Sequence, residues 1–170
     1  MTRYVVFSHG KESGPWGVKI LALAAVARDL GWAVESIDYQ GMEDPSERVL
    51  KLLSVGADLG FAPILVGSSM GGHVATAATV GLNAGGLFLM APAFYMPGYE
   101  SLTPRPNAAR VEIAHGWRDD IVPVDHSIRW ARTHRATLHL LDTDHQMQDC
   151  VEELSALFRR FLVAVGAPKG

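Results

Sequence analysis

Pro63-Ile64-Leu65-Val66-Gly67-Ser68-Ser69-Met70-Gly71 joins a short apolar run to a charge-free segment rich in alanine and threonine. The apolar run is typical of a buried strand, and the segment that follows favours a helix. Between them stands Gly-x-Ser-x-Gly, a pattern typical of a tight turn that presents its central serine above the edge of a sheet. Glycine on both sides leaves room for the unusual backbone conformation of that serine. The stretch predicts a candidate nucleophile, Ser69, beside a helix N-terminus whose Met70 N–H faces an anion formed there.

The rest of the chain repeats this alternation of short apolar runs and longer segments of helical period. Strands are expected at residues 3–8, 33–38, 63–67, 86–90, 110–115 and 136–141. Helices are expected at residues 18–30, 45–57, 70–80, 124–132 and 149–165. Because parallel strands joined by helices cross over right-handedly, this rhythm predicts an α/β fold with a three-layer, doubly wound sheet of about six parallel strands. The charge-free helix at 70–80 is expected to be the most buried.

Length and composition restrict the class of protein further. A chain of 170 residues corresponds to a single domain, 1–170. Hydrophobic residues make up 48% and charged residues 19%, a balance that excludes intrinsic disorder. The net charge of -3 and the isoelectric point near 6.1 provide no basic surface for nucleic acid or an anionic bilayer. We therefore expect neither a nucleic-acid partner nor membrane binding.

The candidate membrane and export segments are also too short. The apolar run at the N-terminus does not have the length of a signal peptide. Residues 59–99 contain no charged side chain, but glycine, proline and polar residues divide them into pieces that cannot span about 30 Å of hydrocarbon. The single cysteine, Cys150, cannot form an internal disulfide or a cysteine-built zinc site, so a cytoplasmic protein is expected.

Polar side chains that could carry chemistry follow most of the predicted strands. In doubly wound sheets the carboxyl ends of the strands meet at one edge, where ligands bind. The residues expected at this edge are His9, Ser69, His115, Asp119, Asp120, Asp142, Asp144 and His145. A nucleophile, acids and histidines are thus predicted to converge there.

In these motifs the chain resembles the α/β-hydrolase superfamily, and the resemblance covers nearly its whole length. Three motifs match in the family's chain order of serine, acid and histidine. The family usually starts with two further strands, so the chain resembles a minimal version. That version implies the spatial strand order 2-1-3-4-5-6, numbered along this chain. The family's lid is then reduced to the loop at residues 92–107, and an open site without a separate lid domain is expected.

The resemblance implies roles for the two sides of the serine. Ser8-His9-Gly10 is similar to the family's His-Gly oxyanion loop, which implies a second N–H donor at or next to Lys11, beside Met70. His115-Gly116-Trp117-Arg118-Asp119-Asp120-Ile121-Val122-Pro123 is similar to the family's H-G-x-x-D-x-x-V-P pattern, which implies Asp119 as the acid. Asp120 is the competing choice.

Of the seven histidines, His145 alone sits in a loop after the last predicted strand. Its surroundings are similar to the family's final catalytic loop, which implies His145 as the base. The family often has glycine directly before this histidine, where this chain has Asp144. Two alternatives stay open: Asp144 is a local charge beside the imidazole, or His145 is an ordinary loop histidine.

The predicted function is cleavage of a small carboxylic ester through an acyl-enzyme on Ser69. Thioesterase or amidase activity on the same fold, or a non-catalytic binding protein, are the alternatives. The residues expected to contact substrate are His9, Trp16, Tyr95 and Trp117, with Phe94 and Met96 as further pocket walls; alternatively, the aromatic residues cover the core. The chemistry needs no cofactor. No metal is expected, because Asp142 and Asp144 alone are too short a signal.

Overall fold

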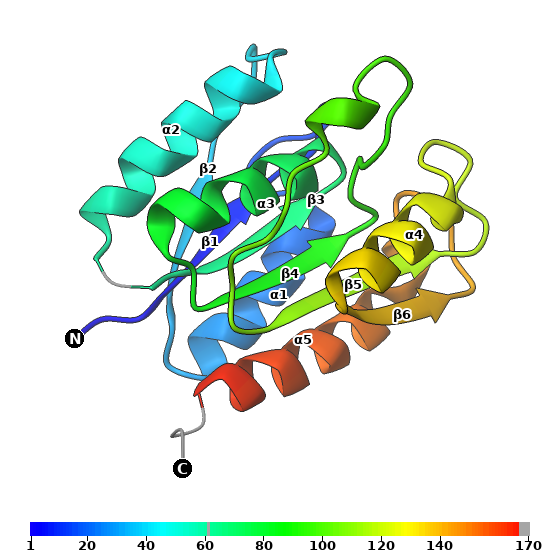
Figure 1. The fold of residues 1–170 in the computed structure, drawn as a ribbon. Helices are drawn as coiled ribbons and strands as arrows, with labels where there is room; N and C mark the ends of the chain where they lie inside the picture. The colour runs from blue at the N-terminus through cyan, green and yellow to red at the C-terminus, as the bar shows by residue number, and fades with distance from the viewer. Residues whose placement is uncertain (61, 167–170) are drawn as a thin grey trace.

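The computed structural model describes residues 1–60 and 62–166; residues 61 and 167–170, part of the predicted domain, lie outside the described residues. Six parallel strands form one sheet in the order β2-β1-β3-β4-β5-β6, which confirms the predicted order (Figure 1). The strands are β1 (Tyr4–Ser8), β2 (Ala33–Ile37), β3 (Ile64–Ser68), β4 (Gly86–Met90), β5 (Val111–Gly116) and β6 (Thr137–Leu141). Each lies within one residue of its predicted bounds.

Helices cover both faces of the sheet, as predicted (Figure 1). They are α1 (Val18–Asp29), α2 (Pro45–Asp58), α3 (Met70–Leu82), α4 (Val124–His134) and α5 (Val151–Gly166). α1 and α5 pack on one face, and α2, α3 and α4 pack on the other. No helix in the described part of the chain is long and apolar enough to cross a membrane.

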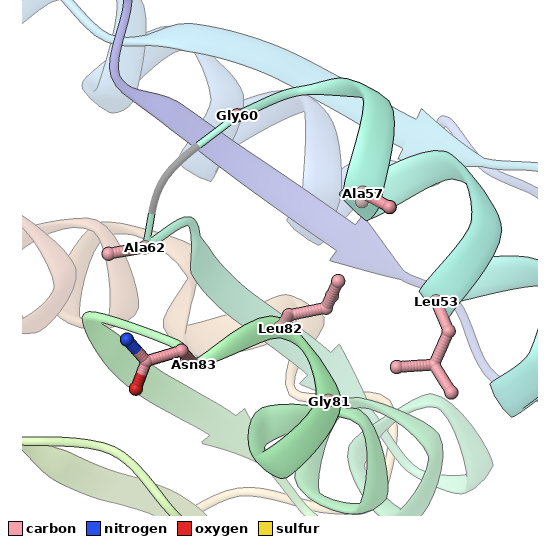
Figure 2. A pocket seen from close by; sticks show the side chains of 8 residues that line it. Leu53, Ala57, Gly60, Ala62, Gly81, Leu82 and Asn83 are labelled. Carbon is pink, nitrogen blue, oxygen red and sulfur yellow. The ribbon is translucent and has the colours of Figure 1, made fainter.

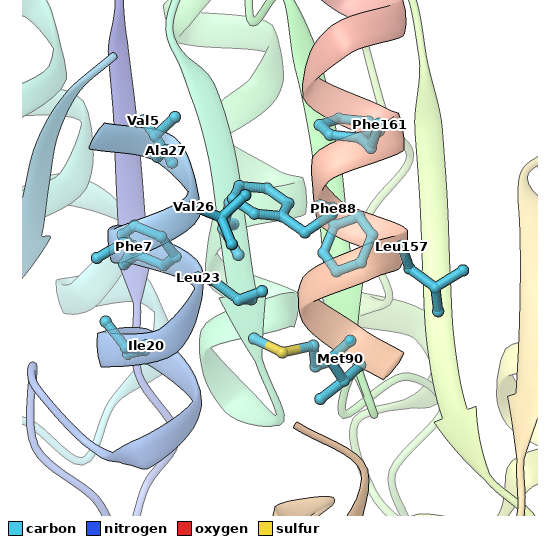
Figure 3. Close-up of a cluster of buried hydrophobic side chains, with 14 of the residues drawn as sticks. Val5, Phe7, Ile20, Leu23, Val26, Ala27, Phe88, Met90, Leu157 and Phe161 are labelled. Atoms are coloured by element: carbon cyan, nitrogen blue, oxygen red, sulfur yellow. The ribbon is translucent and has the colours of Figure 1, made fainter. Parts of the chain in front are cut away.

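Side chains along β4 point alternately to the two faces of the sheet, so this strand contributes to the hydrophobic core on each face. Phe88 and Met90 point toward α1 and α5, whereas Leu87 and Leu89 point toward the opposite helices. On the first face, the ring centroid of Phe88 lies 5.1 Å from that of Phe158 and 5.4 Å from that of Phe161, both on α5. Figure 3 shows Phe88 between Val26 of α1 and Phe161 of α5. Because both faces of the central strands are covered, these strands are apolar throughout, which explains the charge-free stretch in the sequence.

α3 is the most buried helix, as predicted. Eight of its 13 residues are buried. Its small side chains allow close approach: a Cβ added at Gly71 would lie 2.0 Å from the carbonyl oxygen of Ser8. This contact brings the N-terminus of α3 directly against the end of β1.

The helix ends differ from the predicted ones by up to two residues. α3 and α4 each continue two residues further, because Asn83 and Arg135 end them in the left-handed conformation, with φ of 47° and 55°. α5 begins two residues later than predicted, after the short 3-10 helix Gln148–Cys150. Neither Asn83 nor Arg135 provides the glycine signal on which a sequence-based helix end depends.

Candidate active site

Ser69 occupies the turn between β3 and α3 with φ of 54° and ψ of -120°. Few non-glycine residues adopt positive φ, so the turn depends on its surroundings. A Cβ at Gly67 would lie 2.3 Å from the carbonyl oxygen of Gly71, so neither flanking glycine has space for a side chain. The Ser69 N–H donates to the carbonyl of Met90 at 3.0 Å, which ties the turn to the end of β4. The local structure thus matches the predicted turn.

Three side chains from three different loops form one hydrogen-bonded chain. The Oγ of Ser69 lies 3.1 Å from Nε2 of His145, in the loop after β6. The Nδ1 of His145 lies 2.7 Å from Oδ2 of Asp119, in the loop after β5. A carboxylate only accepts hydrogen bonds, so Nδ1–H donates to Asp119 and Nε2 is free to accept the serine proton. This is the arrangement of nucleophile, base and orienting acid.

Asp119 is fixed from both of its oxygens. Its carboxylate is fully buried, and Oδ1 accepts the N–H groups of Ile121 at 2.9 Å and Val122 at 2.8 Å. Burial raises the pKa of Asp119, but the hydrogen bonds from His145, Val122 and Ile121 outweigh it and hold that pKa below its usual value. Asp120, the competing choice, is exposed. The structure therefore brings Asp119, and not Asp120, to His145.

His115 contacts the same carboxylate, a role that the sequence analysis missed. Its fully buried ring places Nε2 at 2.9 Å from Oδ2 of Asp119 and 3.0 Å from the carbonyl of Val122, while Nδ1 lies 2.7 Å from Oγ of Ser127. Burial lowers the pKa of His115, although Asp119 opposes this effect. A neutral ring that donates from Nε2 and accepts the Ser127 hydroxyl satisfies all three contacts. The spacing of four residues to Asp119 was the available signal.

Two backbone N–H groups beside Ser69 are the expected oxyanion donors. Met70 opens α3, and Lys11 follows Gly10, where an added Cβ would lie 3.4 Å from Cβ of Ser69. In the described part of the chain, neither the Met70 N–H nor the Lys11 N–H donates to another protein group. The N-terminus of α3 adds positive partial charge at the same place. The role of these two N–H groups as oxyanion donors stays a prediction.

His9 differs from the expected substrate contact. Its side chain is fully buried, Nε2 accepts the Tyr39 N–H at 2.8 Å, and Nδ1–H donates to the carbonyl of Gly10 at 2.7 Å. Burial lowers its pKa, which favours the neutral ring that these two bonds require. The His-Gly pattern marked the correct turn, but the ring points into the protein. His9 holds the turn and leaves no surface for substrate.

The other expected substrate contacts divide into exposed and packed residues. Trp16 and Trp117 are 42% and 55% exposed, so both are accessible. Tyr95 is half-buried, with the guanidinium of Arg129 4.0 Å from its ring centroid. Phe94 is fully buried and stacks on Trp130 with centroids 4.6 Å apart, so it belongs to the core rather than to a pocket wall.

The loop at residues 92–107 is attached to its neighbours along its length. The carbonyl of Phe94 accepts Nδ1–H of His126 at 2.7 Å, and the carbonyl of Pro104 accepts the Trp130 indole N–H at 3.0 Å. Near the end of the loop, the Asn107 N–H donates to Oγ1 of Thr79 at 2.8 Å. These bonds hold the loop on α3 and α4. The loop is the segment to which the family's lid was expected to be reduced.

Asp144 has a local structural role. Its Oδ1 accepts the N–H groups of Gln146 at 3.0 Å and Met147 at 3.1 Å, and Met147 has φ of 54°. These bonds close the turn that presents His145. The Asp144 carboxylate therefore caps the turn that follows His145.

Elsewhere among the described residues, the structure has a pocket away from Ser69 and no group of side chains that could hold a metal ion. A pocket of about 530 Å³ lies between the C-terminal ends of α2 and α3, lined by Leu53, Gly56, Ala57, Gly60, Ala62, Gly81, Leu82 and Asn83 (Figure 2). None of these residues belongs to the loops that carry Ser69, Asp119 or His145. No group of three or more His, Cys, Asp or Glu side chains among residues 1–60 and 62–166 could hold a metal ion.

Comparisons with known proteins agree with the fold. Residues 5–168 match the model of the alpha/beta hydrolase family. The crystal structure of a Xanthomonas campestris pv. campestris protein assigned to the alpha/beta hydrolase superfamily is 31% identical, with a TM-score of 0.86 over 95% of this chain and 99% of that one. No curated protein sequence matches the chain.

More distant structures share the fold alone. Est1E from Butyrivibrio proteoclasticus is 15% identical, with a TM-score of 0.83 over 96% of this chain and 88% of that one. An esterase from Pyrococcus furiosus is 15% identical, with a TM-score of 0.81 over 95% of this chain and 83% of that one.

Proposed function

The chain belongs to the α/β-hydrolase family, and from this premise we propose that it is a serine hydrolase that cleaves small carboxylic esters through an acyl-enzyme on Ser69. The observation that carries the proposal is the hydrogen-bonded chain from Ser69 Oγ through His145 to Asp119, at 3.1 Å and 2.7 Å. Three loops far apart in sequence converge to make it. A binding protein would not need all three groups in this order.

In the proposed acylation step, His145 Nε2 accepts the Ser69 proton while Oγ attacks the ester carbonyl carbon. The carbonyl oxygen becomes an oxyanion and accepts the N–H groups of Met70 and Lys11. Asp119 keeps the imidazole in the required tautomer and stabilises its cation. The tetrahedral intermediate collapses, and His145 gives the proton to the leaving alcohol.

Deacylation repeats these steps with water in place of Ser69. His145 removes a proton from the water, the resulting nucleophile attacks the acyl carbon, and Ser69 recovers its proton as the acid leaves. The same N–H groups hold the second oxyanion. The chain's own residues therefore supply every group that the cycle needs.

We take small esters as the first substrates to test, because the loop at 92–107 begins beside the nucleophile, where the Ala93 N–H donates to the carbonyl of Ser69 at 2.9 Å, and is held on α4 by its bond to His126. The structurally similar Pyrococcus furiosus protein is itself an esterase. Thioesters and amides share the mechanism, so they belong in the same substrate screen.

The proposal is tested with the purified protein, a fluorophosphonate probe and p-nitrophenyl esters of two to eight acyl carbons. We expect labelling and hydrolysis by the wild-type chain, and neither by Ser69→Ala, because only Ser69 has glycine at both flanking positions of the turn. Ser68→Ala is the matched control, since Ser68 is the adjacent buried serine and has no bond to His145. Equal hydrolysis by the wild-type and Ser69→Ala proteins would remove the proposal.

A further inference from the structure

Arg48 lies in the first turn of α2 with only 2% of its surface exposed, which is unusual for an arginine. It shares the buried face of α2 with Leu52 and Gly56, where an apolar side chain is expected. Among residues 1–60 and 62–166, no carboxylate lies within salt-bridge distance of its guanidinium. Buried charges are normally paired, so the position of Arg48 must be explained by what else it binds.

The guanidinium binds backbone carbonyls. Its Nε–H donates to Met42 at 2.7 Å, and its Nη1–H groups donate to His9 at 3.1 Å and Gly10 at 3.3 Å. The ring of Tyr39, with its centroid 5.1 Å from the guanidinium carbon, is not an anion at neutral pH, because burial raises the pKa of Tyr39 to about 12. The buried positive charge is therefore directed at the turn that follows β1.

His9 holds the same turn. The Tyr39 N–H can only donate, so Nε2 of His9 accepts it and the ring proton lies on Nδ1. This proton goes to the carbonyl of Gly10 at 2.7 Å, which also accepts from Arg48. The carbonyl of Gly10 is thus fixed by two buried donors.

Fixing this carbonyl also fixes the next N–H. In a trans peptide, the C=O of one residue and the N–H of the next point in opposite directions, and the described residues contain no cis peptide. Because the Gly10 carbonyl faces the buried Arg48, the Lys11 N–H faces away from it. Gly10 lies against Ser69, and the Lys11 N–H donates to no protein group in the described part of the chain.

We propose that Arg48 is a positioning residue for ester hydrolysis, which fixes the Gly10–Lys11 peptide so that the Lys11 N–H points at the oxyanion formed on Ser69. The inference rests on the proposed function. Arg48 does not contact the substrate. It acts through one peptide unit, with His9 as its partner on the same carbonyl.

The charge of Arg48 favours the transition state over the bound ester. A cation bonded to the Gly10 carbonyl polarises that peptide and strengthens its N–H as a donor, an effect that weak solvent screening preserves. The ester carbonyl carries little charge before attack, whereas the oxyanion carries nearly a full one. Loss of Arg48 is therefore expected to lower kcat and leave KM nearly unchanged.

The test compares Arg48→Met and Arg48→Lys with the wild-type protein, using p-nitrophenyl acetate as substrate and a trifluoromethyl ketone of similar size as inhibitor. The ketone forms a hemiketal oxyanion with the serine, so its Ki reports the oxyanion donors. Removing one such donor costs roughly 10²- to 10³-fold in kcat, and a donor that is only misaligned costs less. We expect Arg48→Met to lose about 30-fold in kcat and in ketone affinity, with KM within about twofold.

Lys51→Met is the matched control. Lys51 lies one turn along α2 and donates to the carbonyl of Asp38 at 2.6 Å, but it makes no bond to the oxyanion turn. It should keep wild-type kcat and Ki. Arg48→Lys keeps a buried cation, but its single nitrogen cannot occupy both the Nε position at Met42 and the Nη1 position at His9 and Gly10, so its losses should be about 5-fold. This variant also carries the test if Arg48→Met does not fold.

The outcomes separate this inference from the proposed function. A wild-type protein that neither hydrolyses esters nor reacts with the ketone contradicts the proposed function itself. If the wild-type protein is active, wild-type kcat and Ki in a folded Arg48 variant overturn the inference. A rise in KM that accounts for the whole loss, with unchanged Ki, also overturns it, because Arg48 would then support substrate binding only.

Discussion

Asp119→Asn tests the candidate triad at the position where the structure makes the sharpest statement. Oδ1 of Asp119 accepts two backbone N–H groups, from Ile121 and Val122, which can only donate. The amide oxygen of an asparagine must therefore take the Oδ1 site. Its NH₂ group is then forced onto the Oδ2 site, which faces His145 Nδ1 at 2.7 Å.

This exchange reverses the tautomer of His145. Nδ1 must now accept from the amide, so the ring proton moves to Nε2, where it faces the Ser69 hydroxyl. The base can no longer accept the serine proton. In the serine-protease precedent the same change lowers turnover on the order of 10⁴-fold, which corresponds to about 5.5 kcal/mol of barrier. We expect a loss of that order in kcat.

The fold should survive the exchange, because the second ring on Oδ2 can adapt. His115 can keep its proton on Nε2 and donate it to the carbonyl of Val122, 3.0 Å away, so it loses only its bond to the replaced carboxylate oxygen. The assay is hydrolysis of p-nitrophenyl acetate at equal folded fraction, checked by thermal melting. Asp120→Asn is the control and should change kcat less than twofold, since Asp120 is exposed. An Asp119→Asn protein within tenfold of wild-type activity would refute the argument.

Two further predictions concern stability. Gly71→Ala places a Cβ 2.0 Å from the carbonyl oxygen of Ser8, so we expect urea titrations to show a loss of about 3 kcal/mol or more in the free energy of unfolding. Gly17→Ala is the control and should be nearly neutral, because a Cβ there has no atom within 4 Å. A Gly71→Ala protein of wild-type stability would contradict the packing of α3 against β1. Burial lowers the pKa values of His9 and His115, so the unfolded state takes up protons first as the pH falls. The stabilisation from the two neutral rings is complete above their unfolded pKa of about 6.5, and it is lost as the pH falls toward their lowered folded-state pKa values, at up to about 1.4 kcal/mol per pH unit for each group. A melting temperature that stays constant from pH 7.5 to 5.5 would show that these rings take up protons in the folded state.

The sequence predicted the features of the fold that depend on residues close together in the chain. One continuous stretch of sequence predicts the strand before Ser69, the glycines of the turn and the helix after it. The six strands lie where predicted because each is a short apolar run with turn residues at its ends. The order of the strands required the family resemblance, since crossovers alone allow several orders. Asp119 and His145 could be placed at one edge of the sheet by a general rule, because their loops follow the carboxyl ends of neighbouring parallel strands.

Side-chain direction could not be predicted in this way. His9 stands at the predicted turn, but its ring turns inward because the Tyr39 N–H, 30 residues away, offers a bond there. The sequence left Phe94 open between a pocket wall and the core, and the structure places it in the core, stacked on Trp130. Both outcomes depend on groups that come close only in the folded chain. The helical period of residues 45–58 did indicate a buried Arg48, because it places this cation on the same face as Leu52 and Gly56.

The order of the strands explains why the oxyanion turn is supported from α2. The chain leaves β2, runs along α2 and enters β3 on the far side of β1, so this crossover passes over β1 (Figure 1). The first turn of α2 therefore starts at the carboxyl edge, beside the turn that follows β1. Arg48 is the first inward-facing residue of that helix. A change at Arg48 alters the oxyanion side without touching Ser69, His145 or Asp119, so it separates the contribution of the turn from that of the proton-transfer groups.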